Sequence, residues 1–281
     1  MKIALYIAHE GLMRMLFDLW EDHDVRICEK WEGADRLKPK VMKGDEDIIV
    51  STMPHHELNW LNTDKPVIAY MTDPIYPTAR EGFKFWQKKE NFITIGAEDC
   101  YLPEMIEPVS DYIPYAMTKY PTYNGTTNKV LIVNRKADKR LMEVTRAALY
   151  GHDLPEGKVY DVAQMMGNLP YAVANIINPT LFKQMYANYK VLFYFSNSPY
   201  TAVMYEAMYV GIPVVAYDFT LGGLNSVIEK YFPKRSIFPD EIRKMLQEEL
   251  DKPAQKVIYP FPSFEEIKAK WNDLFERRLN A

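Results

Sequence analysis

Three charged features have side chains suited to chemistry on phosphate and hydroxyl groups. Arg135, Lys139 and Arg140 follow a short apolar run, and cations at a helix start can hold a phosphate together with the free backbone N–H groups. Glu206 lies in a helical pattern, where a carboxylate can accept hydrogen bonds from two neighbouring hydroxyls. Asp73 follows another apolar run, and a carboxylate there can take a proton from a hydroxyl. A solvated charge run, an exposed helical glutamate and a turn aspartate before a proline are the structural alternatives.

The motifs of several other chemistries are absent. The two cysteines, Cys28 and Cys100, form no CxxC and have no Cys/His ligand spacing, which argues against a structural zinc site and fits a reducing compartment. The sequence has no P-loop, GxGxxG fingerprint, HExxH pair or serine nucleophile elbow. Its net charge is −4, whereas proteins that bind long stretches of nucleic acid are usually basic, so any nucleic-acid contact must be local.

The elements that must position these side chains alternate between short apolar runs and helical patterns. This alternation predicts a parallel sheet flanked by helices, and such sheets bind ligands at the carboxyl ends of their strands. A helix is expected over residues 11–20. Strands are expected over residues 3–8, 25–28, 48–51, 67–70, 92–95 and 111–114.

A polar stretch over residues 118–128 separates this pattern from a second one, and we interpret it as a linker. The second pattern again alternates, with strands expected over 129–134, 158–162, 191–195 and 214–217 and helices over 141–149 and 201–209. We therefore expect an N-terminal domain over 1–117 and a C-terminal domain over 129–262, as the length of 281 residues favours.

The last segment, residues 263–281, has the spacing of a helix that begins with a capping box. Ser263 and Glu266 are three residues apart and precede apolar positions that share one helical face. The N-terminus lacks the apolar run and cleavage site of a signal peptide, and no stretch approaches the roughly 18 apolar residues of a membrane span. We therefore expect a cytoplasmic protein.

The segment 206–215 reads Glu-Ala-Met-x-x-Gly-x-Pro-Val-Val. It resembles the donor-site helix and following strand of GT-B glycosyltransferases, especially those of family 4. The resemblance implies an α/β GT-B fold, in which two Rossmann-like domains face each other across a cleft and the C-terminal helix packs back on the first domain. It also implies that Glu206 accepts hydrogen bonds from the ribose hydroxyls of a nucleotide-sugar donor, most commonly a UDP-sugar.

The same resemblance assigns further donor contacts. It implies that Arg135, Lys139 and Arg140 hold the donor pyrophosphate, and that Gly222 and Gly223 approach the donor phosphate or sugar. A turn explains the Gly-Gly pair equally well.

Two departures from family 4 disfavour its retaining mechanism. Ser198 stands where these enzymes carry an acidic residue, eight positions before the ribose glutamate. Ser226 replaces the acidic residue that follows their Gly-Gly.

Asp73 lies in a segment that resembles phage DNA β-glucosyltransferases, where an aromatic-rich strand runs into Thr-Asp-x-x-x-Pro. The aspartate is the catalytic base of those enzymes, so the resemblance implies an inverting transfer with Asp73 as base. The cations around Arg135 can then balance the charge of the departing nucleotide diphosphate. No metal is required, although Mg²⁺ could assist.

The acceptor side is expected to include His9, Glu10, His55, His56, Lys84 and Trp86. The histidines follow expected strands, although histidines in a loop are often merely exposed. Lys84 and Trp86 belong to a basic-aromatic cluster of the kind that helps to hold an exposed base.

Three roles remain open from the sequence. We favour a hydroxymethylated pyrimidine in phage DNA as the acceptor. The alternatives are a saccharide acceptor, such as a cell-surface glycan, and a protein that binds nucleotide sugars without catalysis.

Overall fold

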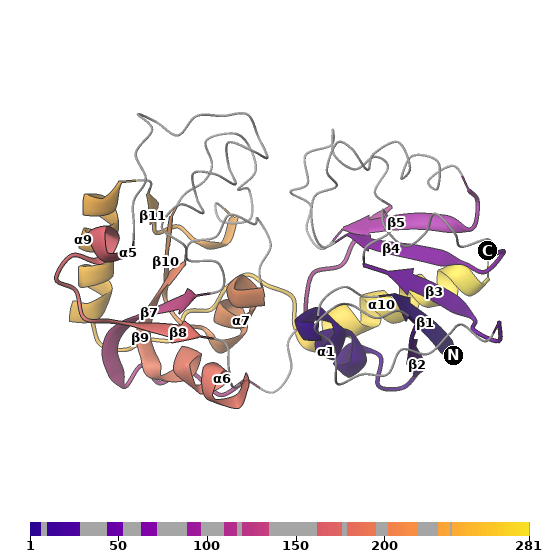
Figure 1. The fold of residues 1–281 in the computed structure, drawn as a ribbon, viewed down its shortest axis with the longest axis horizontal. Coiled ribbons are helices and arrows are strands. Elements are labelled where there is room, and N and C mark those ends of the chain that lie inside the picture. Colours follow the sequence, from indigo (N-terminus) through magenta and orange to yellow (C-terminus); the bar gives the residue numbers. More distant parts are fainter. Residues whose placement is uncertain are drawn as a thin grey trace. The chain divides into compact units, whose positions relative to one another are not determined.

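The computed structural model shows a chain of two units, Met1–Thr118 with Pro262–Ala281 and Lys119–Phe261, each built on its own sheet (Figure 1). No helix in the described part of the chain is long and apolar enough to cross a membrane. The structure describes residues 1–6, 10–28, 44–52, 63–71, 89–96, 110–116, 120–134, 162–175, 179–194, 202–217, 230–236 and 238–280.

The sheet of the first unit is entirely parallel. Its order is β2-β1-β3-β4-β5-β6, so the chain adds β2 on one side of β1 and all later strands on the other. Apolar residues dominate its central strands, because both faces of a parallel sheet are covered; Ile48, Ile49 and Val50 are fully buried. Helix α1 is Glu10–Leu19, and the strands are β1 (Lys2–Tyr6), β2 (Asp24–Ile27), β3 (Ile48–Ser51), β4 (Val67–Met71), β5 (Phe92–Gly96) and β6 (Asp111–Tyr112).

The C-terminal helix α10 (Phe264–Leu279) belongs to this first unit. It begins with the predicted capping box, in which the Ser263 hydroxyl accepts from the Glu266 amide and the Glu266 carboxylate accepts from the Ser263 amide. Its fully buried Trp271 packs edge-on against Trp20 of the segment after α1, with ring centroids 4.9 Å apart. The expectation that this helix packs back on the first half of the chain is confirmed.

The second unit carries a five-stranded parallel sheet of order β11-β10-β9-β7-β8. Helices α5 and α9 cover one face of the sheet, and α6 and α7 lie on the other (Figure 1). The strands are β7 (Thr127–Asn134), β8 (Tyr171–Asn175), β9 (Tyr189–Tyr194), β10 (Val214–Tyr217) and β11 (Arg235–Ser236), and the helices are α5 (Val162–Met166), α6 (Pro179–Asn188), α7 (Ala202–Val210) and α9 (Pro239–Asp251).

The core of the second unit follows the alternation of its strands. Val130 and Ile132 of β7 point to the face covered by α5 and α9, where Ile242 and Leu246 of α9 pack against them. Leu131, between them in the sequence, is equally buried on the opposite face. Both faces of the sheet are therefore apolar, as a parallel sheet between helix layers requires.

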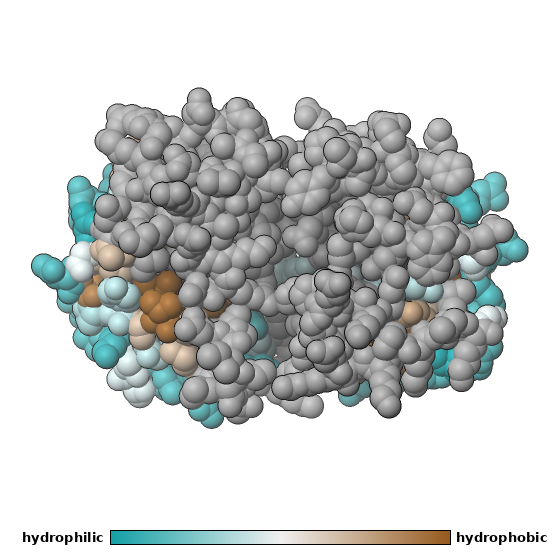
Figure 2. Space-filling view, in the orientation of Figure 1, coloured by the Kyte–Doolittle hydropathy of each residue, from teal (hydrophilic) through white to brown (hydrophobic). Residues whose placement is uncertain are grey.

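One strand of the second sheet is only partly covered. Hydrophobic residues reach the molecular surface in places (Figure 2). In the edge strand β8, Tyr171 and Val173 are 39% and 44% exposed. A half-exposed edge strand has a weak apolar pattern, which explains why the sequence did not predict β8.

Other expectations about single elements have mixed outcomes. The strand expected over 158–162 is wrong at its last residue, because Val162 begins helix α5. The remainder of that strand and the helix expected over 141–149 lie outside the described residues. Elements α6, α9 and β11 were not expected.

Candidate functional site

Glu206 lies near the middle of α7, the helix between β9 and β10. The helix ends at Gly211, whose φ of +83° lies in the left-handed region that glycine adopts without strain. The Gly211 amide donates to the carbonyl of Ala207 at 2.9 Å and closes the last turn. Pro213 then precedes β10 directly. The Gly-x-Pro turn thus determines where the helix ends and the buried strand begins.

The Glu206 carboxylate is half-buried and is held by two tyrosine hydroxyls. Tyr120 donates to Oε1 at 2.8 Å, and Tyr186 of α6 donates to Oε2 at 2.9 Å. Each oxygen of the carboxylate thus has its own tyrosine donor. The group is therefore oriented by the protein.

Lys183 extends this arrangement along α6. Its ammonium lies 4.5 Å from the ring centroid of Tyr120, which is the geometry of a cation–π contact. Lys183 and Tyr186 are three residues apart and share one helical face. One turn of α6 therefore contacts both Glu206 and the tyrosine that binds it.

A second segment, residues 256–261, holds α7 at its other end. The hydroxyl of Tyr259 donates to the carbonyl of Ile212 at 2.8 Å, and burial raises the pKa of this phenol, so it stays a protonated donor. Phe261 packs edge-on against Tyr205 and Tyr209, with ring centroids 5.3 Å and 5.5 Å away. The helix that carries Glu206 is thus fixed both at residue 206 and at its carboxyl end.

The two sheets each have a point where the strand order reverses. In the second unit, the parallel neighbours β7 and β9 form this point, and in the first unit β1 and β3 do. Ligands of open α/β sheets bind beyond the carboxyl ends of the strands at such points. In the sequence, Arg135 follows β7 directly, His9 comes three residues after β1, and His55 four residues after β3.

Of the residues predicted for the site, the structure describes Glu206 with its side chain and Glu10 as the first residue of α1. It does not bring these two together in one unit. The others lie outside the described residues: His9, His55, His56, Asp73, Lys84, Trp86, Arg135, Lys139, Arg140, Gly222 and Gly223.

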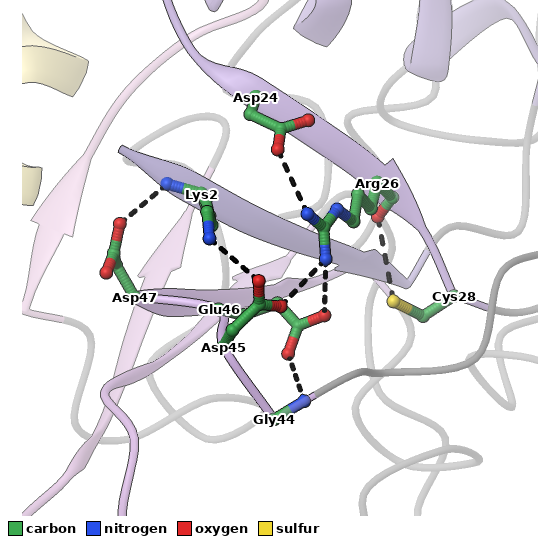
Figure 3. A network of polar contacts seen from close by, with 8 residues as sticks. All are labelled: Lys2, Asp24, Arg26, Cys28, Gly44, Asp45, Glu46 and Asp47. Atoms are coloured by element: carbon green, nitrogen blue, oxygen red, sulfur yellow. Dashed lines mark hydrogen bonds and ion pairs between the residues drawn. The ribbon is translucent and has the colours of Figure 1, made fainter.

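A network of charged residues in the first unit links β1, β2 and the residues before β3 (Figure 3). Asp45 accepts hydrogen bonds from the Lys2 ammonium at 2.7 Å and from the Arg26 guanidinium at 2.8 Å. Asp47 accepts from the Lys2 amide at 2.7 Å. Lys2 begins β1, and Asp45 and Asp47 precede the amino end of β3, whereas ligands of parallel sheets bind at the carboxyl ends. The network therefore joins strands and is not a candidate active site.

Cys28 and Glu46 belong to the same network and do not form a reactive pair. Glu46 is 1% exposed, and it accepts from the Gly44 amide at 2.8 Å. Burial, followed by the negative charge of Glu46, raises the pKa of the Cys28 thiol to about 11, so the nucleophilic thiolate is scarce at neutral pH. Among the described residues, no group of three His, Cys, Asp or Glu side chains could hold a metal ion.

Sequence reasoning missed Tyr120, Tyr186 and Lys183. Tyr120 falls in the stretch expected to be a linker, and the other two lie in α6, which was not expected. Glu206 is 86 residues from Tyr120 and 20 from Tyr186, so no local spacing relates them.

No protein-family model matches the chain, and no curated protein matches it either. Solved structures do match the chain. HepE of Anabaena, in complex with UDP and glucose, matches with a TM-score of 0.56 at 13% identity over 99% of this chain and 100% of that one. The T4 phage β-glucosyltransferase matches with a TM-score of 0.52 at 12% identity over 100% of both chains.

A putative UDP-N-acetylglucosamine 2-epimerase from Listeria monocytogenes matches comparably, with a TM-score of 0.51 at 14% identity over 98% of this chain and 97% of that one. The likenesses extend over nearly the whole chain at low identity, so they establish architecture and leave the reaction open. The chain has the GT-B fold, and the α/β fold expected from the sequence is confirmed.

Proposed function

We propose that this protein is a glycosyltransferase that moves a sugar from a nucleotide-sugar donor to an acceptor hydroxyl. The observation that carries the proposal is the carboxylate of Glu206, held by Tyr120 and Tyr186 on the helix that precedes β10. It lies in a GT-B fold and in the sequence motif that predicts a ribose-binding glutamate. Fold alone would fit an epimerase too, and the Asp73 motif favours transfer.

The donor is a nucleoside diphosphate sugar, with UDP as the first nucleotide to test, since HepE was solved with UDP and glucose. In the proposal, Glu206 accepts from the ribose hydroxyls, and Gly222 and Gly223 allow close approach of the donor. Arg135, Lys139 and Arg140 bind the pyrophosphate. They begin right after β7, at the point of order reversal in the second sheet, which supports this assignment.

Asp73 is the proposed catalytic base. It comes two residues after β4, a central strand of the first sheet. In the step, the acceptor oxygen forms a bond to the anomeric carbon while the bond from that carbon to the diphosphate oxygen breaks. The acceptor proton passes to Asp73, and the cations after β7 balance the charge of the leaving diphosphate. The configuration at the anomeric carbon is inverted. The step requires no metal, and Mg²⁺ is an optional aid to the leaving group.

The favoured acceptor is a hydroxymethylated pyrimidine in phage DNA. The Thr-Asp-x-x-x-Pro segment at Asp73 and the match to the T4 enzyme over the full length of both chains support this choice. Lys84 and Trp86 would hold DNA or the exposed base, and His9, Glu10, His55 and His56 would line the acceptor side. Such an enzyme would act in the cytoplasm of the infected cell.

The test is mass spectrometry of nucleosides after the protein is incubated with hydroxymethylcytosine DNA and a panel of nucleotide sugars. We expect a mass gain of one sugar, and its loss in Asp73→Asn. Asp64→Asn is the matched control, because Asp64 is exposed and precedes the amino end of β4. No gain on the DNA, with transfer when saccharides are offered in its place, would keep the transferase and replace the acceptor. Donor binding without transfer or hydrolysis would overturn catalysis.

A further inference from the structure

We propose that Tyr120 and Tyr186 are positioning residues for the donor: they hold the Glu206 carboxylate in the orientation in which it accepts hydrogen bonds from the ribose hydroxyls. This inference rests on the proposed function and adds two residues that the sequence motif does not contain. Both tyrosines and Glu206 belong to the second unit.

The geometry gives each carboxylate oxygen its own donor. Tyr120 contacts Oε1 and Tyr186 contacts Oε2, at 2.8 Å and 2.9 Å. A glutamate side chain loses much rotamer freedom when it is ordered, and these two bonds remove that freedom before a ligand arrives. A pair of neighbouring hydroxyls then meets two oriented acceptors, which is the usual way that a binding site is preorganised.

The supports of the two tyrosines differ. Tyr186 is fully buried within α6, so its ring is fixed by packing. Tyr120 is half-buried, and the Lys183 ammonium lies 4.5 Å from its ring centroid. The contact with a cation favours one ring position for Tyr120. Replacing Tyr120 should therefore disturb the fold less than replacing Tyr186.

Other tyrosine hydroxyls show what a purely structural bond looks like here. Tyr70, Tyr123 and Tyr259 donate to the main-chain carbonyls of Ile113, Lys190 and Ile212. Those bonds satisfy main-chain carbonyl groups. Tyr120 and Tyr186 instead converge on a carboxylate, whose desolvation is costly. A ligand-binding role accounts for that cost.

Tyr123 provides a matched control. It lies three residues from Tyr120, and its hydroxyl makes a bond of the same 2.8 Å length to a carbonyl. Tyr123→Phe therefore removes an equivalent hydrogen bond from the same segment and leaves Glu206 untouched.

The experiment is calorimetric titration of UDP and of 2′-deoxy-UDP into the intact protein and its variants. The readout is the ratio of the two dissociation constants, because a structural defect would weaken both ligands alike. If UDP does not bind, the ribo and deoxy forms of ADP, GDP and CDP are used as the pair. For the unmodified protein we expect a preference for the ribonucleotide of about tenfold or more, from one hydrogen bond to a charged group.

In Tyr120→Phe and Tyr186→Phe the preference should fall at least threefold, toward the value for Glu206→Gln, while Tyr123→Phe keeps it. If Tyr186→Phe does not fold, Tyr120→Phe carries the test. An unchanged preference in the tyrosine variants, with a lost preference in Glu206→Gln, would overturn the positioning role alone. An unchanged preference in Glu206→Gln would overturn this inference together with the ribose contact. Absence of any nucleotide binding would overturn the proposed function.

Discussion

The carbonyl oxygen of Gly211 accepts a 2.8 Å hydrogen bond from the amide of Val257. This bond fastens the turn after the Glu206 helix to the segment that leads back to the first unit. The approach is so close that a Cβ on Gly211 would lie 2.7 Å from the Val257 carbonyl oxygen and 2.6 Å from the Lys256 side chain. Glycine is therefore required here by its backbone conformation and by its neighbours.

Gly211→Ala should destabilise the second unit by about 3 kcal/mol or more, because the left-handed backbone costs roughly 1–2 kcal/mol and the clash adds to it. The matched control is Gly44→Ala, at φ +85° with no atom within 4 Å of the added Cβ; it should lose only about 1 kcal/mol. Urea unfolding followed by circular dichroism checks both. All five tryptophans lie in the first unit. In Gly211→Ala, the urea midpoint followed by tryptophan fluorescence should therefore shift far less than the midpoint followed by circular dichroism. Equal losses in the two variants would contradict the clash.

Trp271→Ala should destabilise the first unit by about 3–5 kcal/mol, the usual range for removing a buried tryptophan. The ring is fully buried between Trp20 and Tyr70, with centroids 4.9 Å and 5.1 Å away. Leu279→Ala at the exposed end of the same helix is the control, and it should change stability by less than about 0.5 kcal/mol. The measurement is the urea midpoint from the remaining tryptophans. A small effect of Trp271→Ala would mean that α10 does not complete this core.

Cys28 should react slowly with iodoacetamide in the folded protein. Its pKa is raised to about 11 by burial and by Glu46, so at pH 8 the thiolate fraction is more than about a hundredfold below that of an ordinary cysteine. The rate, followed by peptide mapping, should rise about tenfold per pH unit from pH 8 to 10. The urea-unfolded chain is the control and should react at the ordinary rate. A rate that rises only about threefold from pH 8 to 9 and then levels off would show that the thiol is not shifted.

Asp45 should contribute stability that depends on pH. Hydrogen bonds from Lys2 and then Arg26 lower the pKa of its carboxyl to about 2, below the roughly 3.9 of an unfolded chain. The contribution is therefore complete above about pH 5 and is lost as the pH falls through the folded pKa. The difference in urea midpoint between the unmodified protein and Asp45→Asn should be constant from pH 7 to 5 and shrink at pH 4 and 3. Because the Lys2–Asp45 pair is exposed, 1 M salt should also reduce this difference in urea midpoint. A difference that grows on acidification would contradict the assignment.

Much of the fold could be predicted because buried strands have a local signature. The strands over 48–51 and 214–217 were predicted with the bounds that the structure gives, since each is a short apolar run buried on both faces. Helix α9 could have been predicted: Pro239 opens it, Asp240 and Glu241 follow, and Ile242 and Leu246 share one face. The order of the strands within each sheet could not be predicted, because it depends on packing between distant segments.

The site was predictable only in part. Glu206 has a local motif around it, which the sequence revealed. Tyr120 and Tyr186 become its partners only when α6 packs beside α7 and residues 120–126 join the second unit. The sequence spacing of Tyr120, Tyr186 and Glu206 does not indicate that the tyrosines bind the glutamate. Hydrogen bonds between side chains of distant segments depend on the tertiary fold.

The central claim is that the protein cleaves the bond between a sugar and a nucleoside diphosphate and passes the sugar to a hydroxyl. The most direct measurement is release of free nucleoside diphosphate from a panel of nucleotide sugars, with and without hydroxymethylcytosine DNA. We expect slow release from one donor without acceptor, a marked acceleration by the DNA, and loss of that acceleration in Asp73→Asn. No release from any donor, with nucleotide binding intact, would contradict the claim and leave a protein that binds nucleotide sugars without transferring them.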